Sequence, residues 1–407
     1  MRDVIVLGAG VVGMTSAYAL AREGFNVQVI DAANAAAGGG ASFGNGAQLS
    51  YSYSDAMASP SLAANLPKYL LGRDPAFRID LSASPAFLIW GMRFLANATR
   101  GRFERNTIDL LKLAMESREG FAELSKKVTF DYRQPGKLNL YATTEALRYA
   151  EKLCGLKNRY GAQQVVLGPR EAIEREPALA HYGHSFAGAL WAPLDEVGNS
   201  RLFCENLQRL LEVEHGVKFR FETKVERLKK RRGRIDAVVT DAGDFACENV
   251  VLALGTGAVD IARTVGAHLP IWPVQGYSTT IPAGLNAPTA SITDTARKIV
   301  FCRLGDKLRI AGIADIGNNS EFREARFQSM LQTAKEAFPS AGDFQAELNA
   351  WTGWRPVTPN SQPLIGESRI KGLFLNCGHG SLGWTLSIAA ANRLAECLRN
   401  KPPSLPA

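Results

Sequence analysis

The N-terminal pattern of hydrophobic positions predicts a strand, a helix and a second strand in close succession. Residues 2–7 (RDVIVL) form a short apolar run, 14–24 (MTSAYALAREG) is rich in Ala and Leu, and 26–31 (NVQVID) is a second apolar run. The stretch GAGVVG separates the first strand from the helix, and the second strand ends in Asp31. This order of strand, glycine loop, helix, strand and acid is typical of a dinucleotide-binding unit.

Each residue of the glycine loop has its own role in that interpretation. Gly8 permits a tight turn, Gly10 lets the backbone approach a pyrophosphate, and Gly13 lets the helix pack on the sheet. Val12 lies in the same turn, at a helix N-terminus that attracts phosphate. Asp31 would bind ribose hydroxyls and disfavour the 2′-phosphate of NADP. Glycines also serve strand-to-helix turns that bind no ligand, and the motif does not separate NAD from FAD.

Further predicted elements extend this sheet, and others form a second unit. A helix is expected at 200–215, started by Asn199 or Ser200 and ended by Gly216, and 233–258 predicts a hairpin followed by the apolar strand NVVLALG. Other helices are expected from Ser84 and over 109–127, and strands at 274–282, 298–304 and 307–313 are typical of an antiparallel sheet. We therefore predict an α/β chain of two discontinuous units: cofactor-binding, 1–50, 196–260 and 346–407; substrate-binding, 51–195 and 261–345.

The C-terminal stretch repeats the pattern of strand, glycines and helix. WTGWRPVTPNSQPLIG (351–366) precedes a predicted strand, GLFLNCG, a second glycine turn, HGSLGWT (379–385), and a helix over 386–400. Two such turns, far apart in the sequence, fit one long cofactor held at both ends. Arg355 is the single charge among the aromatic, Gly, Pro and small residues of 351–359. Because an unpaired guanidinium in apolar surroundings is costly, Arg355 must reach solvent or hold an anion.

Composition and charge exclude several classes of protein. The 407 residues are 46% hydrophobic and 21% charged, the balance of a globular protein rather than a disordered one. No signal peptide or apolar membrane span is predicted, and the six dispersed cysteines offer no zinc spacing, so we expect a cytoplasmic chain without a metal. Much of the net charge of +8 falls in 68–105 and 224–234, with no aromatic stacking motif between these bases, so nucleic acid is not an expected partner.

Five stretches, VIVLGAGVVGMTSAYAL, GNGAQLS, PVQGYS, WTGWRPVTPNSQPLIG and LNCGHGSLGWT, together resemble the flavin-bearing subunit of the FAD-dependent D-amino acid dehydrogenases. That family lies within the wider group of D-amino acid oxidase, glycine oxidase and sarcosine oxidase. The resemblance implies a glutathione-reductase-type domain that binds FAD non-covalently, beside an antiparallel substrate domain. It also implies that Arg355, in GWRP, binds the substrate carboxylate through two parallel hydrogen bonds. A structural ion pair is the other interpretation of this arginine.

The resemblance places further cofactor and substrate contacts on this chain. The loop 378–383 is expected to offer backbone donors near the pyrimidine end of the flavin. His379 either adds a dipole or a charge there or is a capped loop histidine. The expected cofactor contacts outside the first glycine turn are Ser42, Asn45, Gly46, Gln48, Val225, Gly255, Gly353, Gly378, His379, Gly380, Leu382, Gly383, Trp384 and Thr385. The expected substrate contacts besides Arg355 are Tyr51, Tyr53, Tyr277 and Gly380, although tyrosines more often pack in cores.

The implied reaction is oxidation of a D-amino or D-imino acid to a 2-oxo acid with release of ammonia. A hydride leaves Cα for FAD, and no residue stands out as a dedicated general base. The electrons then pass to a quinone, which the chain would reach by docking on an anionic membrane through 68–105 or 224–234. The other interpretation of these two stretches is an ordinary surface rich in Lys and Arg. Gln275 stands where dehydrogenases of this kind carry a basic residue, which leaves substrate size and electron acceptor open.

Three alternatives remain open. The chain is an oxidase of glycine, sarcosine or hydroxyproline that uses O2, or it is a flavin-binding subunit that depends on a partner subunit. Binding of nucleic acid, suggested by charge alone, is a distant third. The sequence does not specify the side chain of the substrate or the oligomeric state.

Overall fold

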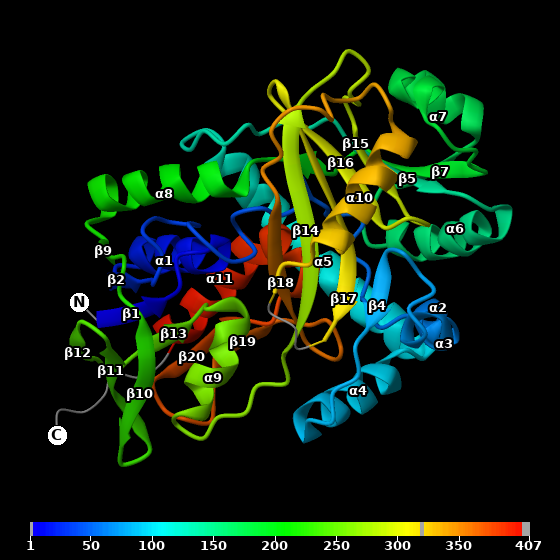
Figure 1. Ribbon diagram of the computed structural model, residues 1–407. Coiled ribbons are helices and arrows are strands. Elements are labelled where there is room, and N and C mark those ends of the chain that lie inside the picture. Colours follow the sequence, from blue (N-terminus) through cyan, green and yellow to red (C-terminus); the bar gives the residue numbers. More distant parts are fainter. Residues whose placement is uncertain (1–2, 318–320, 401–407) are drawn as a thin grey trace.

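A six-stranded, mostly parallel sheet forms the middle layer of one half of the molecule (Figure 1). The computed structural model describes residues 3–317 and 321–400, and residues 1–2, 318–320 and 401–407 of the predicted units lie outside them. The strands, in spatial order, are β19 (Leu364–Glu367), β20 (Leu373–Cys377), β13 (Val250–Leu252), β1 (Asp3–Leu7), β2 (Asn26–Ile30) and β9 (Lys218–Arg220), with β19 alone antiparallel to its neighbour among these described strands.

Two layers enclose this sheet. One face is covered by α1 (Val11–Arg22), α8 (Ser200–His215), α11 (Gly383–Arg399) and α5 (Arg100–Leu124), which share one apolar core with β1 and β2. The other face is covered by α9 (Ala258–Arg263) and by a small antiparallel sheet of β10 (Val225–Arg231), β11 (Arg234–Thr240) and β12 (Gly243–Ala246). The parallel strands are therefore buried on both sides, as their continuous apolar runs require.

A larger, mainly antiparallel sheet forms the other half. Its strands, in spatial order, are β18 (Trp351–Val357), β14 (Trp272–Pro282), β17 (Lys307–Ile316), β16 (Ile299–Leu304), β15 (Ser291–Asp294), β5 (Lys137–Tyr141), β7 (Gly188–Ala192) and β6 (Val165–Leu167), and β4 (Phe77–Ile79) pairs with β17. Helices α10 (Glu324–Ala337) and α7 (Pro169–Arg175) pack against it, while α2 (Pro60–Ala64), α3 (Leu66–Leu70), α4 (Pro85–Asn97) and α6 (Thr144–Asn158) lie around its edge. A two-stranded ladder of β3 (Gln48–Leu49) and β8 (Glu196–Val197) links the halves.

The predicted fold class is confirmed, and most predicted elements are present. Helix α8 begins after Asn199, whose side chain accepts a hydrogen bond from the backbone N–H of Leu202, and it ends at Gly216 in the left-handed conformation with φ of 64°. The three strand-like runs at 274–282, 298–304 and 307–313 form neighbouring antiparallel strands. Local signals therefore suffice for these elements.

Two segments pack differently from the predicted division into units. Helix α5, expected in the substrate-binding unit, packs against α11 within the core of the parallel half. Strand β18, expected in the cofactor-binding unit, is hydrogen-bonded along its length to β14 in the larger sheet. Both differences arise because sequence order does not reveal which sheet or core a long amphipathic segment joins.

Gly13 provides a test of the packing between α1 and the first glycine turn. A Cβ added at Gly13 would lie 1.8 Å from the carbonyl oxygen of Gly8, so Gly13→Ala should lower the free energy of unfolding by about 1–3 kcal/mol. Gly155 in α6 is a matched control, because an added Cβ there meets nothing within 4 Å. Ala at Gly155 should raise stability by about 0.5–1 kcal/mol. Equal effects of the two substitutions in urea unfolding would contradict this account.

Candidate active site

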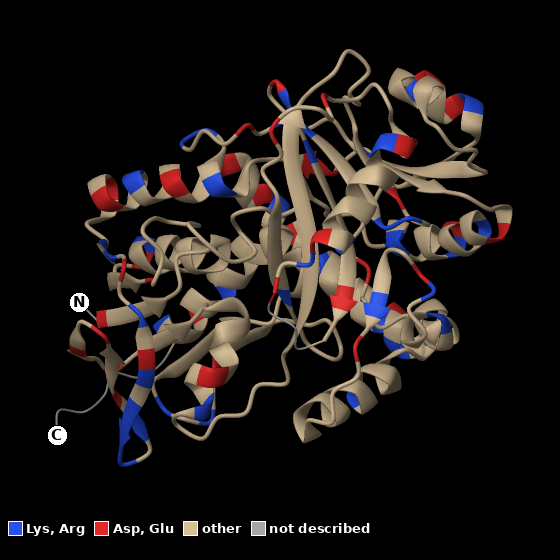
Figure 2. Ribbon diagram, viewed as in Figure 1, with Lys and Arg blue, Asp and Glu red and all other residues tan. Residues whose placement is uncertain are grey.

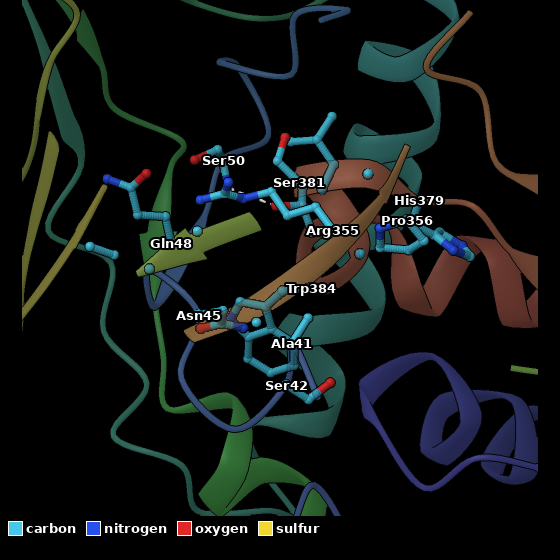
Figure 3. Close-up of a pocket in the computed structure, with 18 of the residues that line it drawn as sticks. Ala41, Ser42, Asn45, Gln48, Ser50, Arg355, Pro356, His379, Ser381 and Trp384 are labelled. Atoms are coloured by element: carbon cyan, nitrogen blue, oxygen red, sulfur yellow. Dashed lines mark hydrogen bonds between the residues drawn. The ribbon is translucent and has the colours of Figure 1, made fainter. Parts of the chain in front are cut away.

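A cavity of about 1060 Å³ is lined by residues from both sheets and by both glycine turns (Figure 3). Of the residues predicted to contact cofactor or substrate, those that line it are Gly8, Gly10, Val12, Asp31, Ser42, Asn45, Gly46, Gln48, Tyr53, Gly255, Tyr277, Gly353, Arg355, Gly378, His379, Gly380, Leu382, Gly383, Trp384 and Thr385. Segments far apart in the sequence thus meet around one space.

The first glycine turn is shaped for close approach of a ligand backbone. Gly8 has φ of 105°, and a Cβ there would lie 2.6 Å from the carbonyl oxygen of Ala253. Gly10 has no room for a side chain either, because its Cβ would lie 2.9 Å from the Ser42 hydroxyl oxygen. The Asp31 carboxylate lines the cavity and accepts hydrogen bonds from the backbone N–H groups of Ala9, at 2.6 Å, and Ala33, at 2.7 Å. These contacts fix the carboxylate at the position where the motif expects ribose hydroxyls.

Ser42 supplies the cap that α1 lacks in its own sequence. Helix α1 follows Gly10, which has no side chain, and the Ser42 hydroxyl accepts a hydrogen bond from the backbone N–H of Val11 at 3.0 Å. Because Ser42 lies 31 residues further along the chain, capping rules based on local sequence do not find this contact. The loop that carries Ser42 is thereby held against the N-terminus of α1, with both lining the cavity.

The second glycine turn places polar atoms of buried side chains against the cavity. Gly378 and Gly380 have φ of 78° and 58°, and between them His379 is 3% exposed. The His379 Nε2 and Trp384 Nε1 atoms are buried without a hydrogen-bond partner in the described part of the chain. Burial lowers the pKa of His379 to about 4, so the imidazole is neutral at pH 7 and acts as a dipole, not a charge. Unsatisfied buried polar atoms on a cavity wall fit a polar ligand.

Together the two turns fit an extended dinucleotide. The first turn offers a helix N-terminus with glycines that allow close approach, and Asp31 lies beside it. The second offers backbone and side-chain polar groups in the same cavity. The residues present therefore fit the dinucleotide cofactor expected from the sequence.

Arg355 lies in the cavity wall with its guanidinium flat over a glycine. A Cβ at Gly276, on the neighbouring strand β14, would lie 2.3 Å from Arg355 Nη2. Arg355 Nη1 donates hydrogen bonds to the carbonyl oxygens of Ile313, at 3.0 Å, and Gln275, at 3.4 Å. Within the described ranges no carboxylate lies within 4.0 Å of this guanidinium, since Asp315 pairs with Arg326 instead. Burial lowers the pKa of Arg355, partly offset by Asp315, yet an arginine remains charged.

Four other predicted residues have different surroundings. Tyr51 is fully buried outside the cavity wall, and its hydroxyl donates to Glu196 at 2.8 Å. Val225 begins β10 and packs in the core below the parallel sheet, outside the cavity wall. Gly13 acts through helix packing rather than at the cavity surface. Gln275 also lies outside the wall, because its amide donates to the Glu321 carbonyl and the Thr352 hydroxyl.

Several wall residues were not predicted from the sequence. They are Gly44, Ser50, Asp55, Lys137, Lys157, Gly276, Lys298 and Trp351. Trp351 stacks closely on two glycines, since Cβ atoms at Gly44 and Gly353 would lie 2.5 and 2.2 Å from its ring. The glycines beside Trp351 and Arg355 are therefore the one signal that could have pointed to these contacts, because they make room for large side chains.

The neutral state of His379 predicts a specific pH dependence of stability. An unfolded histidine has a pKa near 6.5. As the pH falls below that value, His379 is therefore protonated in the unfolded chain but stays neutral in the folded chain. Between pH 7.5 and 5.0 this should lower the free energy of unfolding by about 2 kcal/mol. Urea unfolding of His379→Gln should lack that part of the pH dependence, whereas the exposed-site control His268→Gln should keep it. Identical pH dependence in both variants would contradict a neutral, buried imidazole.

Comparisons with known proteins agree with this geometry. Residues 3–397 match the model of the family DAO, FAD dependent oxidoreductase. The chain is 36% identical to "D-amino acid dehydrogenase 2" of Ralstonia nicotianae, over 100% of this chain and 98% of the relative, and 37% identical to "D-amino acid dehydrogenase" of Paramagnetospirillum magneticum, over 99% and 96%.

Solved structures show the same fold at lower identity. L-proline dehydrogenase from P. horikoshii superposes with a TM-score of 0.74 at 19% identity, covering 98% of this chain and 93% of that one. Glycine oxidase from Geobacillus kaustophilus superposes with a TM-score of 0.72 at 21% identity, covering 100% and 97%. With the family match spanning almost the whole sequence and the cavity shaped for an extended dinucleotide, the chain belongs to the DAO family of FAD-dependent oxidoreductases, and its cofactor is FAD.

Proposed function

We propose that this enzyme oxidises a D-amino acid to the corresponding 2-oxo acid with release of ammonia, or a D-imino acid to the corresponding imine. The observation that carries the proposal is Arg355, a cavity-lining guanidinium with no carboxylate partner in the described part of the chain. The full-length relatives named D-amino acid dehydrogenase support the substrate class and its stereochemistry. The sites proposed here as contacts of FAD and substrate are the cavity-lining residues given above, within the two units predicted from the sequence.

Arg355 is suited to bind the substrate carboxylate and to orient the substrate. Its Nη1 atom is held by the carbonyl oxygens of Ile313 and Gln275, which leaves the remaining N–H donors for a ligand. A planar guanidinium grips a carboxylate through two parallel hydrogen bonds, so it determines the direction as well as the position of the substrate. The half-buried site strengthens that interaction because less water competes for the charges.

In the proposed reaction the Cα–H bond breaks and its electron pair leaves with the hydrogen as a hydride. The lone pair of the neutral amine forms the C=N bond, and water then replaces nitrogen to give the 2-oxo acid and ammonia. FAD, when bound, supplies the hydride acceptor. The contribution of the chain is to hold the carboxylate at Arg355 and to keep the reacting carbon enclosed within the cavity. Orientation of this kind accounts for much of the rate in reactions that need no dedicated base.

The first variant to test is Arg355→Met, which removes the charge but keeps an apolar stem. Loss of two charge-assisted hydrogen bonds should reduce kcat/KM by about 100- to 10,000-fold, mainly through KM. Gly276→Ala should act in the same direction because its Cβ displaces the guanidinium. Arg393→Met is the matched control, since Arg393 is exposed on α11 and pairs with Glu116 at the surface. Normal kinetics in Arg355→Met would remove the carboxylate assignment.

The electron acceptor distinguishes this proposal from its nearest rival. A quinone is the acceptor we propose, whereas an oxidase of glycine, sarcosine or hydroxyproline would form peroxide from O2 at the rate of turnover. Reduction of the flavin by substrate in the isolated chain would also show that no partner subunit is needed for the chemical step.

A membrane surface is the proposed place of quinone reduction, and α4 is the element suited to reach it. Phe87, Trp90 and Phe94 on one side of this helix are buried, while on the other side Leu88, Ile89, Met92 and Leu95 are between 41% and 65% exposed. The helix contains no acidic residue and carries Arg93, and Figure 2 shows it almost free of charge at the edge of the molecule. Within the described residues, no helix has the length and apolarity to cross a membrane. An exposed apolar face that carries one base and no acid favours docking onto anionic lipid.

Replacing Leu88 and Met92 together with Ser should weaken binding to vesicles that contain anionic phospholipid by at least about 10-fold, because two apolar side chains lose their burial in the membrane. Co-sedimentation at low salt measures this. Val213 and Leu285, exposed elsewhere at 85% and 102%, are replaced with Ser in the control variant, which should bind as the wild type does. Absent binding of the wild type would dismiss the membrane proposal, and undiminished binding of the Leu88/Met92 variant would show that α4 is not the docking element.

A further inference from the structure

A second cation lines the cavity without an ionic partner. Lys137 begins β5 and is 1% exposed, and its ammonium donates hydrogen bonds to Gln48 Oε1, at 3.0 Å, and to the Ser50 hydroxyl, at 2.8 Å. The ammonium also lies 4.4 Å from the centre of the Tyr53 ring. These partners are all neutral, so the charge of Lys137 is solvated by dipoles and by one aromatic face.

The other lysines of the cavity wall are paired. Lys157 donates to the Asp55 carboxylate at 2.8 Å, and Lys298 lies 3.5 Å from an Asp74 oxygen. Lys137, like Arg355, has no carboxylate within 4.0 Å among residues 3–317 and 321–400. Two of the four Lys and Arg side chains that line the cavity therefore remain available to anions from a ligand.

The buried state of Lys137 is costly as it stands. Burial lowers the pKa of Lys137 to about 8, although Asp195 and Asp55 act in the opposite direction and Lys157 adds to the decrease. Asp195 is itself 1% exposed, and burial raises its pKa. One Asp195 oxygen accepts from the Ser52 backbone, and the other has no hydrogen-bond partner within the described residues. An anion beside Lys137 would offset the cost of burying the ammonium.

Lys137 lies toward the substrate side of the cavity. The wall follows one continuous segment, from Ser42 beside α1, through Gln48 and Ser50, to Tyr53 and Asp55. Beyond that segment the wall is formed by β5 and α6, which contribute Tyr141, Tyr149 and Lys157. Figure 3 places Gln48, Ser50 and Arg355 together around this cavity. Lys137 thus stands beside the residues that join the cofactor part of the wall to the part built by the 51–195 insertion.

We propose that Lys137 binds an anionic group at the end of the substrate side chain, so that the preferred substrates are acidic amino acids such as D-aspartate, D-glutamate or their longer homologue. This inference rests on the proposed function, with Arg355 on the α-carboxylate and Lys137 on the second carboxylate. Gln48 and Ser50 position the ammonium, and Tyr53 shields it from water. A neutral substrate of equal length would leave the buried ammonium without its anion, which opposes its binding.

The decisive experiment compares isosteric substrate pairs, D-glutamate with D-glutamine and D-aspartate with D-asparagine. In the wild type, kcat/KM should favour the acidic member of at least one pair by about 10- to 100-fold, the usual effect of a charge-assisted contact. Lys137→Met and Lys137→Gln should both lose that preference, while Lys112→Met, at an exposed site on α5, should keep it. If the role of Lys137 is only to hydrogen-bond Gln48 and Ser50, Lys137→Gln would keep the preference for the acidic substrate that Lys137→Met loses. That result would overturn the proposal.

Ligand binding separates failure of this inference from failure of the proposed reaction. The wild-type holoenzyme is titrated with succinate, glutarate and adipate and with the monocarboxylates butyrate, valerate and hexanoate, following the perturbation of flavin absorbance. Tighter binding of one dicarboxylate by the wild type, lost in Lys137→Met, supports the anion site. If no D-amino acid reduces the flavin, the proposed reaction is refuted, but this support for the anion site stands. Equal binding of both classes, with neutral D-amino acids oxidised as fast as acidic ones, refutes the Lys137 inference and leaves the reaction standing.

Discussion

The site depends on one constraint: a positive guanidinium must be held in a half-buried cavity without a carboxylate beside it. The fold meets this constraint with backbone carbonyls, because Ile313 and Gln275 accept from Arg355 and Gly276 leaves the space that the planar group occupies. Carbonyl dipoles stabilise the cation but do not neutralise it. The charge therefore remains available to a substrate carboxylate, which an ion pair within the protein would have prevented.

The sheet has a local irregularity beside Arg355. The pairing of β14 with β17 shifts register between Gln275 and Tyr277, and opposite that shift Ile313 has φ of 64°. A β-branched residue rarely adopts this conformation, so the surrounding sheet must hold it there. The bulge is also what places the Ile313 carbonyl beside Arg355, which links a strained backbone position to the chemistry of the cavity.

Sequence reasoning found the parts of the site that local patterns encode. The turn at Gly8 and Gly10, the acid at the end of β2 and the second turn around His379 all carry short motifs in a recognisable order. Lys137 was missed because nothing in a strand reading KLNLY distinguishes an exposed lysine from one buried against Gln48. Tyr51 lies outside the cavity wall, where its hydroxyl donates to Glu196 of the distant strand β8, a partner that local sequence does not reveal.

The most direct test of the central claim is anaerobic reduction of the flavin by a panel of D-amino acids, their L-enantiomers, glycine, sarcosine and D-hydroxyproline. Rapid bleaching of the flavin absorbance is expected with at least one D-amino acid, and none with its L-enantiomer. Persistence of the oxidised spectrum with every compound, in a fully flavinated protein, would contradict the proposal that this chain oxidises D-amino acids.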